Sequence, residues 1–380
     1  MPLFGIAESA VFVTCCACRC RMPNLVLVQR ERIISVFGCH IVGFPRLLSF
    51  SNEEGRSKGA VVADLSIGNK LVVVALGGNA LGETPEEQIE LTKNAAKHIV
   101  DMVVDGARVV VTHGNGPQVG MISNAFAVAS ADAAAKVASM DFPECGALSQ
   151  GYIGYHIAQA ITNELSFRGI EHGVANLSTQ TVVAIDDPAF SDPTKPIGAF
   201  MTEEEARDVA DSTGYAVRED AGRGWRRVVA SPRPQRIVEF DAIRSLVDQD
   251  YIVVAVGGGG IPVIETEQGY RGIPAVIDKD ASAALLARML GADTLVILTA
   301  VEKVCMRYGK PDQSEIDAMS TEYARALIDE GEFPAGSMLP KVEACIGFVE
   351  EVTDGSALIT SLERAAAGLR GETGTVIRQR

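Results

Sequence analysis

Apolar residues along the chain gather in short continuous runs that alternate with segments of helical spacing. The first run, Leu71–Leu76, is apolar at every position, which is typical of a parallel strand covered on both faces. Residues 84–87 (Thr-Pro-Glu-Glu) then mark a helix start, because threonine favours the cap, proline the first position and acids the first turn. Four apolar residues then follow at roughly helical spacing and form one face of the predicted helix: Ile89, Ala96, Ile99 and Val103. Gly106 ends the helix and residues 108–112 form the next run, so the pattern predicts a βαβ unit.

Further apolar runs occupy residues 182–185, 252–256 and 294–298, with helical stretches between several of them. Strands that alternate with helices predict an α/β domain with a mainly parallel central sheet. Residues 186–235 interrupt this rhythm with five prolines, many charges and little continuous apolar sequence. A segment of that length predicts an insertion with its own small structure, in the manner of a lid. At 380 residues the chain is long enough for two domains.

Composition narrows the class of protein. The formal net charge of −15 argues against a general nucleic-acid-binding role, which requires clustered lysine and arginine. Because no apolar run reaches the ~18 residues that cross a bilayer, we expect no membrane association. The three cysteines beyond residue 70 are scattered without zinc-like spacing, which is typical of a reduced, cytoplasmic enzyme.

Residues 1–69 differ from the rest of the chain. They carry seven basic and five acidic residues, together with five of the eight cysteines, and no clear period links their apolar runs. Three interpretations stay open: a presequence for organelle targeting, a mis-set translation start, or a structured extension. The arginine-rich, acid-poor character of the first fifty residues mildly favours targeting.

One repeated arrangement carries the strongest chemical signal: an apolar run that ends in a glycine-rich turn. It occurs at residues 77–80, 114–117 and 257–260. Ligands of open parallel sheets bind beyond the carboxyl ends of the strands, and glycine there lets backbone N–H groups approach an anion. None of the turns matches the P-loop or the dinucleotide fingerprint, so we expect an anion site of another type. Its expected residues are Gly77, Gly78, Asn79, Gly114, Asn115, Gly116, Gly258 and Gly259.

Three lysines occupy unusual positions. Lys279 comes just before the helical run 281–290, Lys341 opens the stretch 342–349, and Lys195 lies in a Pro-Thr-Lys-Pro segment of the insertion. A lysine gains nothing from the helix dipole at a helix start. Most lysines are solvated surface residues, but this placement makes a role in neutralising phosphate plausible.

Blocks of the sequence resemble the carbamate kinases of the amino acid kinase superfamily. They include LVVVALGGNA (71–80), VVVTHGNGPQVG (109–120), VGGGGIPV (256–263), AVIDKDASA (275–283), YGKPD (308–312) and GSMLPKVEA (336–344). Two more, PTKPIGAF (193–200) and EDAGRGWRRVVASP (219–232), are specific to carbamate kinases within that superfamily. The resemblance covers essentially all of residues 70–380 and nothing in residues 1–69.

The resemblance implies an open αβα sandwich with two lobes and a small protruding subdomain, assembled as a homodimer. Residues 70–277, with a lid inserted at about 186–235, are implied to bind carbamate or carbamoyl phosphate, and residues 278–380 to bind ATP or ADP. The implied catalytic residues are Lys195, Lys279, Asp280 and Lys341, with Asp280 organising the lysines. The implied nucleotide contacts are Tyr308, Met338 and Lys341, and Mg²⁺ is implied to accompany the nucleotide without a direct protein ligand.

Carbamate attacks through an oxygen that is already an anion, so this reaction needs positioning and charge stabilisation rather than a general base. His113 is therefore interpreted as holding the second glycine turn, and Trp225, the one tryptophan, as part of the lid's own core. We expect the reaction to run toward ATP synthesis, as in the catabolic members of the family. Two alternatives remain: another kinase of the superfamily, such as one acting on acetylglutamate, and a non-catalytic nucleotide-binding sensor of the same fold.

Overall fold

The computed structural model describes residues 67–380 apart from residues 78–80, 83 and 221. The expectations for residues 1–66 therefore lie outside the described residues. The predicted βαβ unit is confirmed as β1 (Leu71–Leu76), α1 (Pro85–Val104) and β2 (Arg108–His113). Thr84 caps α1 through a reciprocal pair of hydrogen bonds with Glu87, as the Thr-Pro-Glu-Glu pattern predicts.

The prediction that Ile89 belongs to the inward face of α1 is wrong. Ile89 is 37% exposed, whereas its neighbour Gln88 is fully buried. The Gln88 side chain is accommodated because its Oε1 atom lies 2.7 Å from Nδ1 of His156 on α3 (Phe142–Arg168). A polar side chain whose oxygen is hydrogen-bonded, although its buried Nε2 is not, thus occupies the position next to the isoleucine that periodicity favoured.

The central sheet has eight strands in the order β15-β17-β16-β12-β1-β2-β9-β3. All neighbours are parallel except β16 and β17. The sheet runs without a break across the two predicted lobes, because β1 of the first pairs with β12 of the second. Bounds not yet given are β3 (Val174–Asn176), β9 (Ile252–Val254), β12 (Thr294–Leu298), β15 (Ala318–Ser320), β16 (Ser356–Thr360) and β17 (Thr375–Arg378).

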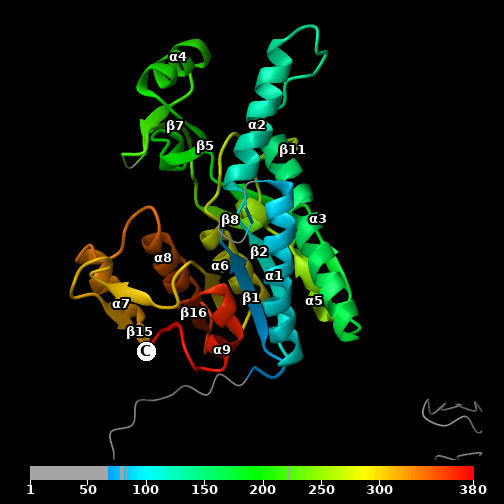
Figure 1. Cartoon of the computed structure of the whole chain (residues 1–380), viewed down its shortest axis with the longest axis vertical. Helices are drawn as coiled ribbons and strands as arrows, with labels where there is room; N and C mark the ends of the chain where they lie inside the picture. Colours follow the sequence, from blue (N-terminus) through cyan, green and yellow to red (C-terminus); the bar gives the residue numbers. More distant parts are fainter. Residues whose placement is uncertain (1–66, 78–80, 83, 221) are drawn as a thin grey trace, which may run out of the picture. The chain divides into compact units, whose positions relative to one another are not determined.

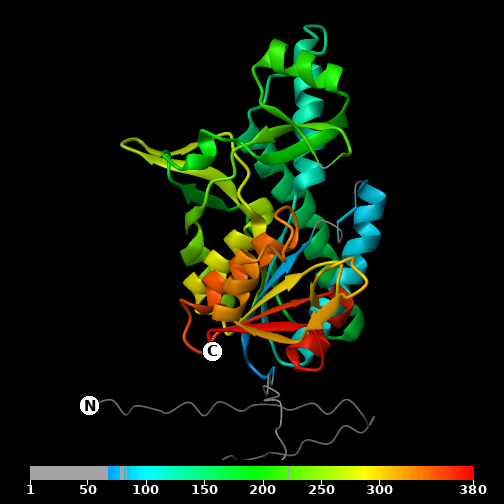
Figure 2. The same cartoon turned by 90° about the vertical axis from the view of Figure 1, so that its left-hand side faces the viewer.

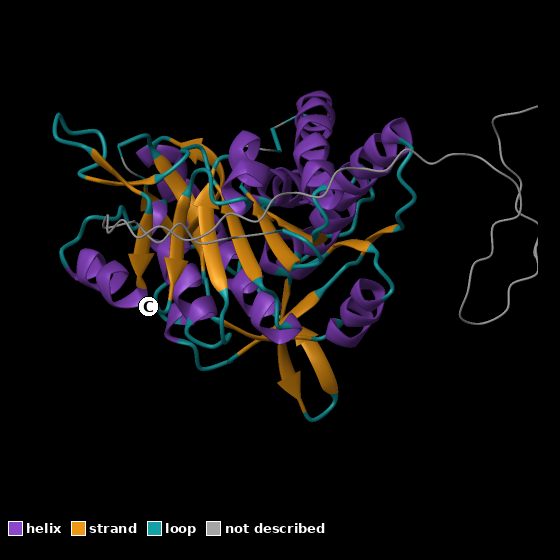
Figure 3. Cartoon of the chain, turned by 90° about the horizontal axis from the view of Figure 1, so that it is seen from below, coloured by secondary structure: helices purple, strands orange, loops and turns teal. Residues whose placement is uncertain are grey.

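Helices cover both faces of this sheet, as the predicted αβα sandwich requires (Figure 3). Alternate residues of β1 point to opposite faces. Val73 and Ala75 join a core with α6 (Lys279–Leu290) and α8 (Met338–Val349), while Val72 and Val74 join a core with α1 and α3. Further helices are α5 (Phe240–Asp248), α7 (Thr321–Asp329) and α9 (Ala365–Leu369).

A second sheet of four strands has the order β11-β10-β4-β8. It contains residues 182 and 183 of the run at 182–185, which the sequence pattern grouped with the central strands; that grouping is wrong. The strand β4 (Gln180–Val183) pairs in parallel with β10 (Ile261–Thr266), and Ile185 beyond it is exposed. The outer strands are β8 (Pro234–Ile237) and β11 (Gly269–Gly272).

Within the predicted insertion, residues 195–229 form a small unit of their own. It consists of β5 (Lys195–Met201), α4 (Glu203–Thr213), β6 (Val217–Glu219) and β7 (Trp225–Val229), with the strands in the order β5-β7-β6. We call this unit the lid. It stands beside α2 (Gly116–Ala131) (Figures 1 and 2). At its base Ile197 and Val229 pack against Val119 of α2 and Phe142 of α3.

Within the part of the chain that the structure describes, no helix is both long enough and apolar enough to span a membrane.

Candidate active site

Gly77 and the glycine turns at residues 114–117 and 257–260 lie at one edge of the central sheet. Because β1, β2, β9 and β12 are parallel neighbours, their carboxyl ends share this edge. Gly77 comes directly after β1 and lies close to the end of β12. A Cβ atom on Gly77 would lie 3.0 Å from the carbonyl oxygen of Leu298. Gly114 follows β2, and its N–H donates to the carbonyl oxygen of Leu76 over 3.2 Å. The predicted residues Gly78 and Asn79 lie outside the described residues.

The third turn, residues 257–260, packs directly on the second. A Cβ atom on Gly257 would lie 2.3 Å from Nε2 of His113, and one on Gly258 would lie 2.2 Å from Nδ2 of Asn115. Gly258 also has a φ of +64°, a backbone conformation that residues with a side chain rarely adopt. These two glycines are therefore needed for close packing between the two turns, a role that the sequence pattern did not distinguish from anion binding.

His113 and Asn115 hold the second turn in place. His113 is buried, and its Nδ1 atom lies 2.8 Å from the carbonyl oxygen of Gly114. Burial lowers the pKa of His113 to about 4, so the ring is neutral near pH 7. Asn115 donates from Nδ2 to Oγ of Ser149 on α3 over 2.8 Å. The structural role predicted for His113 agrees with these contacts.

The start of α6 lies against the third turn. A Cβ atom on Gly259 would lie 2.4 Å from the carbonyl oxygen of Ile277, and Ser282 donates to the carbonyl oxygen of Gly259 over 2.8 Å. Asp278 caps the helix, because its side chain accepts from the N–H groups of Asp280 and Ala281. Residues 278–280 are thereby held at the carboxyl edge of the sheet.

The three predicted lysines gather here around two aspartates. Asp280 is 3% exposed and accepts from both Lys279 and Lys341, the latter over 2.8 Å. Lys195, the first residue of β5, donates to Asp278 over 2.8 Å. The lid, α6 and α8 each supply one lysine, although these lysines lie far apart in the sequence.

Electrostatics at this cluster favour an anionic ligand. Burial by itself would raise the pKa of Asp278, but the charge and hydrogen bond of Lys195, with the charge of Lys279, outweigh it and lower that pKa to about 2. Both aspartates are thus paired with lysines, and three lysines face two carboxylates. The surplus positive charge sits beside glycine turns, in the setting that phosphate binding requires.

Sequence reasoning missed Asp278, which was assigned no role. An aspartate immediately before a helical run is a recognisable cap, but its pairing with a lysine 83 positions away depends on the tertiary fold.

The predicted nucleotide contacts occupy two places. Met338 and Lys341 lie in the first turns of α8, whose N-cap residue Ser337 makes no side-chain cap hydrogen bond. The N–H groups of Ser337 and Leu339 donate to the carbonyl oxygen of Pro334, and Pro340 has no N–H to offer. Tyr308 is 60% exposed and lies between β13 (Val304–Met306) and β14 (Ser314–Ile316), so its nucleotide contact stays a prediction.

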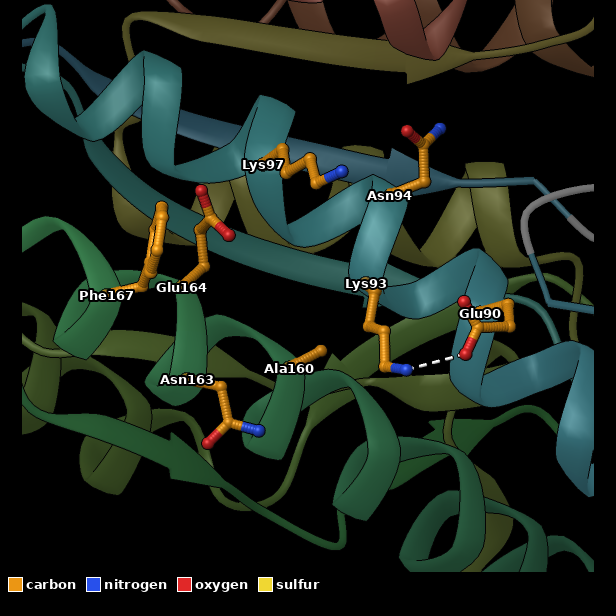
Figure 4. A pocket seen from close by; sticks show the side chains of 8 residues that line it. All are labelled: Glu90, Lys93, Asn94, Lys97, Ala160, Asn163, Glu164 and Phe167. Atoms are coloured by element: carbon orange, nitrogen blue, oxygen red, sulfur yellow. Dashed lines mark hydrogen bonds and ion pairs between the residues drawn. The ribbon is translucent and has the colours of Figure 1, made fainter.

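Two other features lie apart from this cluster. Trp225 is half-buried in β7 of the lid sheet, and its place in the lid's own core stays a prediction. A cavity of about 490 Å³ lies between α1 and α3, where Lys93 pairs with Glu90 over 2.5 Å and Phe167 forms part of the wall (Figure 4). None of the predicted site residues lines this cavity.

Comparisons with known proteins identify the family of the chain. The profile of the amino acid kinase family matches residues 70–360. Carbamate kinase of Staphylococcus haemolyticus is 49% identical over 308 residues, which cover 81% of this chain and 99% of the relative. A carbamate kinase-like protein of Escherichia coli is 51% identical over 311 residues, covering 82% of this chain and all of the relative. The structure of carbamate kinase from Giardia lamblia bound to AMP-PNP superposes with a TM-score of 0.75 at 42% identity, covering 82% of this chain and 99% of that one. The chain therefore belongs to the carbamate kinases of the amino acid kinase family.

Proposed function

We propose that this protein transfers a phosphoryl group reversibly between ATP and carbamate, forming ADP and carbamoyl phosphate. The observation that carries the proposal is the cluster of Lys195, Lys279 and Lys341 around Asp278 and Asp280 at the carboxyl edge of the sheet. The similarity to carbamate kinases, one of them with AMP-PNP bound, indicates the substrate class. We propose ATP synthesis as the physiological direction, and a cytoplasmic homodimer as the working form.

The lysines address the main difficulty of this reaction, which is repulsion between two anions. Carbamate already carries the attacking oxygen as an anion, so no base has to remove a proton. We propose that Lys279 and Lys341 neutralise the nucleotide's phosphates while Lys195 approaches the transferred group from the lid. Donors held in place beforehand stabilise developing charge more than mobile donors do. His113 takes no part as a base in this proposal, because its ring is buried against Gly114.

Asp280 sets the spacing of two of these lysines. Its Oδ1 accepts from Lys279 and its Oδ2 from Lys341, so one buried carboxylate orients two ammonium groups. We propose that Asp280 acts only through these lysines and does not touch the substrate. Asp280→Asn is then expected to lower the rate, because the lysines lose the group that orients them.

Mg²⁺ is proposed to arrive with the nucleotide as part of the substrate. Across the described residues, no three His, Cys, Asp or Glu side chains lie together as a metal site, and both aspartates of the cluster are bound to lysines. Among the described residues, the cluster's carboxylates are thus engaged by lysines, and we propose that the lysines interact with a metal–phosphate complex.

The decisive experiment is an ATP-formation assay with ADP, Mg²⁺ and carbamoyl phosphate. ATP should form, and in the opposite direction ATP should be consumed with carbamate but not with acetylglutamate. ATP consumption with acetylglutamate would favour the other superfamily kinase. Nucleotide binding without turnover of any acceptor by correctly folded protein would favour the non-catalytic sensor. Sedimentation equilibrium tests the homodimer.

A further inference from the structure

Asp278 joins two parts of the molecule through its two carboxylate oxygens. Oδ1 accepts from the backbone N–H groups of Asp280 and Ala281, at 2.9 and 3.3 Å, and so caps α6. Oδ2 accepts from Nζ of Lys195 over 2.8 Å. One oxygen thus faces the nucleotide-side helix while the other faces the lid. A side chain that served only as a helix cap would need the first of these contacts alone.

A second contact ties the lid to the same segment. The N–H of Val276 donates to the carbonyl oxygen of Ala230 over 2.9 Å. In the lid sheet Lys195 lies opposite Val229, so the two chain ends at the base of the lid lie side by side. Both ends therefore reach residues 276–278, one through the backbone and one through the ion pair. Lys195 consequently sits at the base of the lid rather than at its tip.

The ion pair orders the Lys195 side chain before the substrate binds, so this ordering does not have to occur during the reaction. A lysine side chain has four rotatable bonds, and holding it in one arrangement costs conformational entropy. The Lys195 and Asp278 side chains are 36% and 25% exposed, so the pair is less screened than one on the open surface. Asp278 can therefore hold the ammonium group near the phosphates before substrate binds.

We propose that Asp278 is the positioning residue of the lid lysine, holding Lys195 ready for the transferred phosphoryl group. The inference rests on the proposed function, since it assigns Lys195 its place in that reaction. Asp278 is expected to affect phosphoryl transfer through Lys195 alone, while its cap of α6 is a separate, structural contribution.

Two substitutions separate these contributions. Asp278→Asn keeps an oxygen for the helix cap and replaces the other with an NH₂ group, which cannot accept from an ammonium group. Asp278→Ser also keeps a favoured cap residue but lacks an oxygen that reaches the lid. The matched control is Asp105→Asn, which removes the partner of Arg370 in another ion pair, 2.7 Å long, at the C-terminal end of α1.

We expect both Asp278 variants to lower kcat by roughly tenfold to a hundredfold, with the KM for ADP changed less than about twofold, because a small displacement of a catalytic group has effects of this size. The Asp105→Asn control should keep the rate of the unchanged protein. In a Lys195→Ala background, Asp278→Asn should cause no further loss. A loss that persists in that background would overturn the proposal, since Asp278 would then act without the lysine.

A second measurement does not depend on turnover. Trace acetylation of the ligand-free protein, read by mass spectrometry, reports how freely the Lys195 amine reacts. We expect acetylation of Lys195 to rise several-fold in Asp278→Asn and to stay unchanged in Asp105→Asn. Unchanged labelling of Lys195 in Asp278→Asn would overturn the proposal even if the protein makes ATP. Increased labelling in Asp278→Asn, together with no ATP formation by the unsubstituted protein, would leave the pairing standing and refute the proposed function instead.

Discussion

Replacing Gly258 with alanine tests whether the close contact between two glycine turns builds the site. Gly258 has a φ of +64°, and its new Cβ atom would lie 2.2 Å from Nδ2 of Asn115. The left-handed backbone costs an alanine about 1–2 kcal/mol. Forcing the Asn115 side chain aside adds about 1–3 kcal/mol of overpacking. We therefore expect Gly258→Ala to lower the free energy of unfolding by about 2–5 kcal/mol.

Gly291 provides the matched control. It ends α6 with a φ of +63°, and apart from its chain neighbours no described residue has an atom within 4 Å of the position its Cβ would take. Gly291→Ala thus carries the backbone cost without the clash, and should lose only about 1–2 kcal/mol. The difference between the two variants isolates the contact with Asn115.

Urea unfolding followed by circular dichroism measures the stabilities, and ATP formation from carbamoyl phosphate measures the rates. Gly258→Ala should lose at least about tenfold in rate, because the turn must move by more than the positioning of a reacting group tolerates. Gly291→Ala should keep its rate. If the two variants match in stability and both remain fully active, the Asn115 side chain yields freely and the argument from close packing fails.

Three further outcomes are expected. Lys341→Ala should weaken ADP binding and also lower the rate, whereas Lys195→Ala should spare ADP binding and lower turnover on the order of a hundredfold. Calorimetry measures ADP binding and steady-state kinetics measures turnover; loss of ADP binding in Lys195→Ala would refute this. Because burial lowers the pKa of His113 from 6.5 to about 4, its contribution to stability is complete above pH 6.5 and is lost as the pH falls toward 4. The free energy of unfolding should fall by up to about 3 kcal/mol over that range, and an equally steep fall in His113→Gln would contradict this. A chain that starts at Ser66 should fold and keep its turnover, because the family match begins at residue 70; loss of activity on truncation would show that residues 1–65 are needed.

Much of the fold could be predicted from local pattern. The strand Leu71–Leu76, the capped start of α1 and the strand at residues 294–298 follow from apolar runs and from capping chemistry, which act between near neighbours. The pattern was wrong at Ile89 and in the sheet assigned to residues 182–185. In both cases a partner distant in sequence decides the outcome: His156 accommodates Gln88, and β10 pairs with β4.

The sequence by itself determined which residue types could serve phosphate chemistry: glycines after strands, and lysines beside helix starts. Only the tertiary structure decided how they combine. Lys195 meets Asp278, and Lys341 meets Asp280, across 83 and 61 positions of the chain. No local propensity encodes such pairings, because they arise when parallel strands bring their carboxyl ends to one edge and the base of the lid meets the start of α6. The same folding turns Gly258 from a permissive turn residue into the only kind of residue that fits against Asn115.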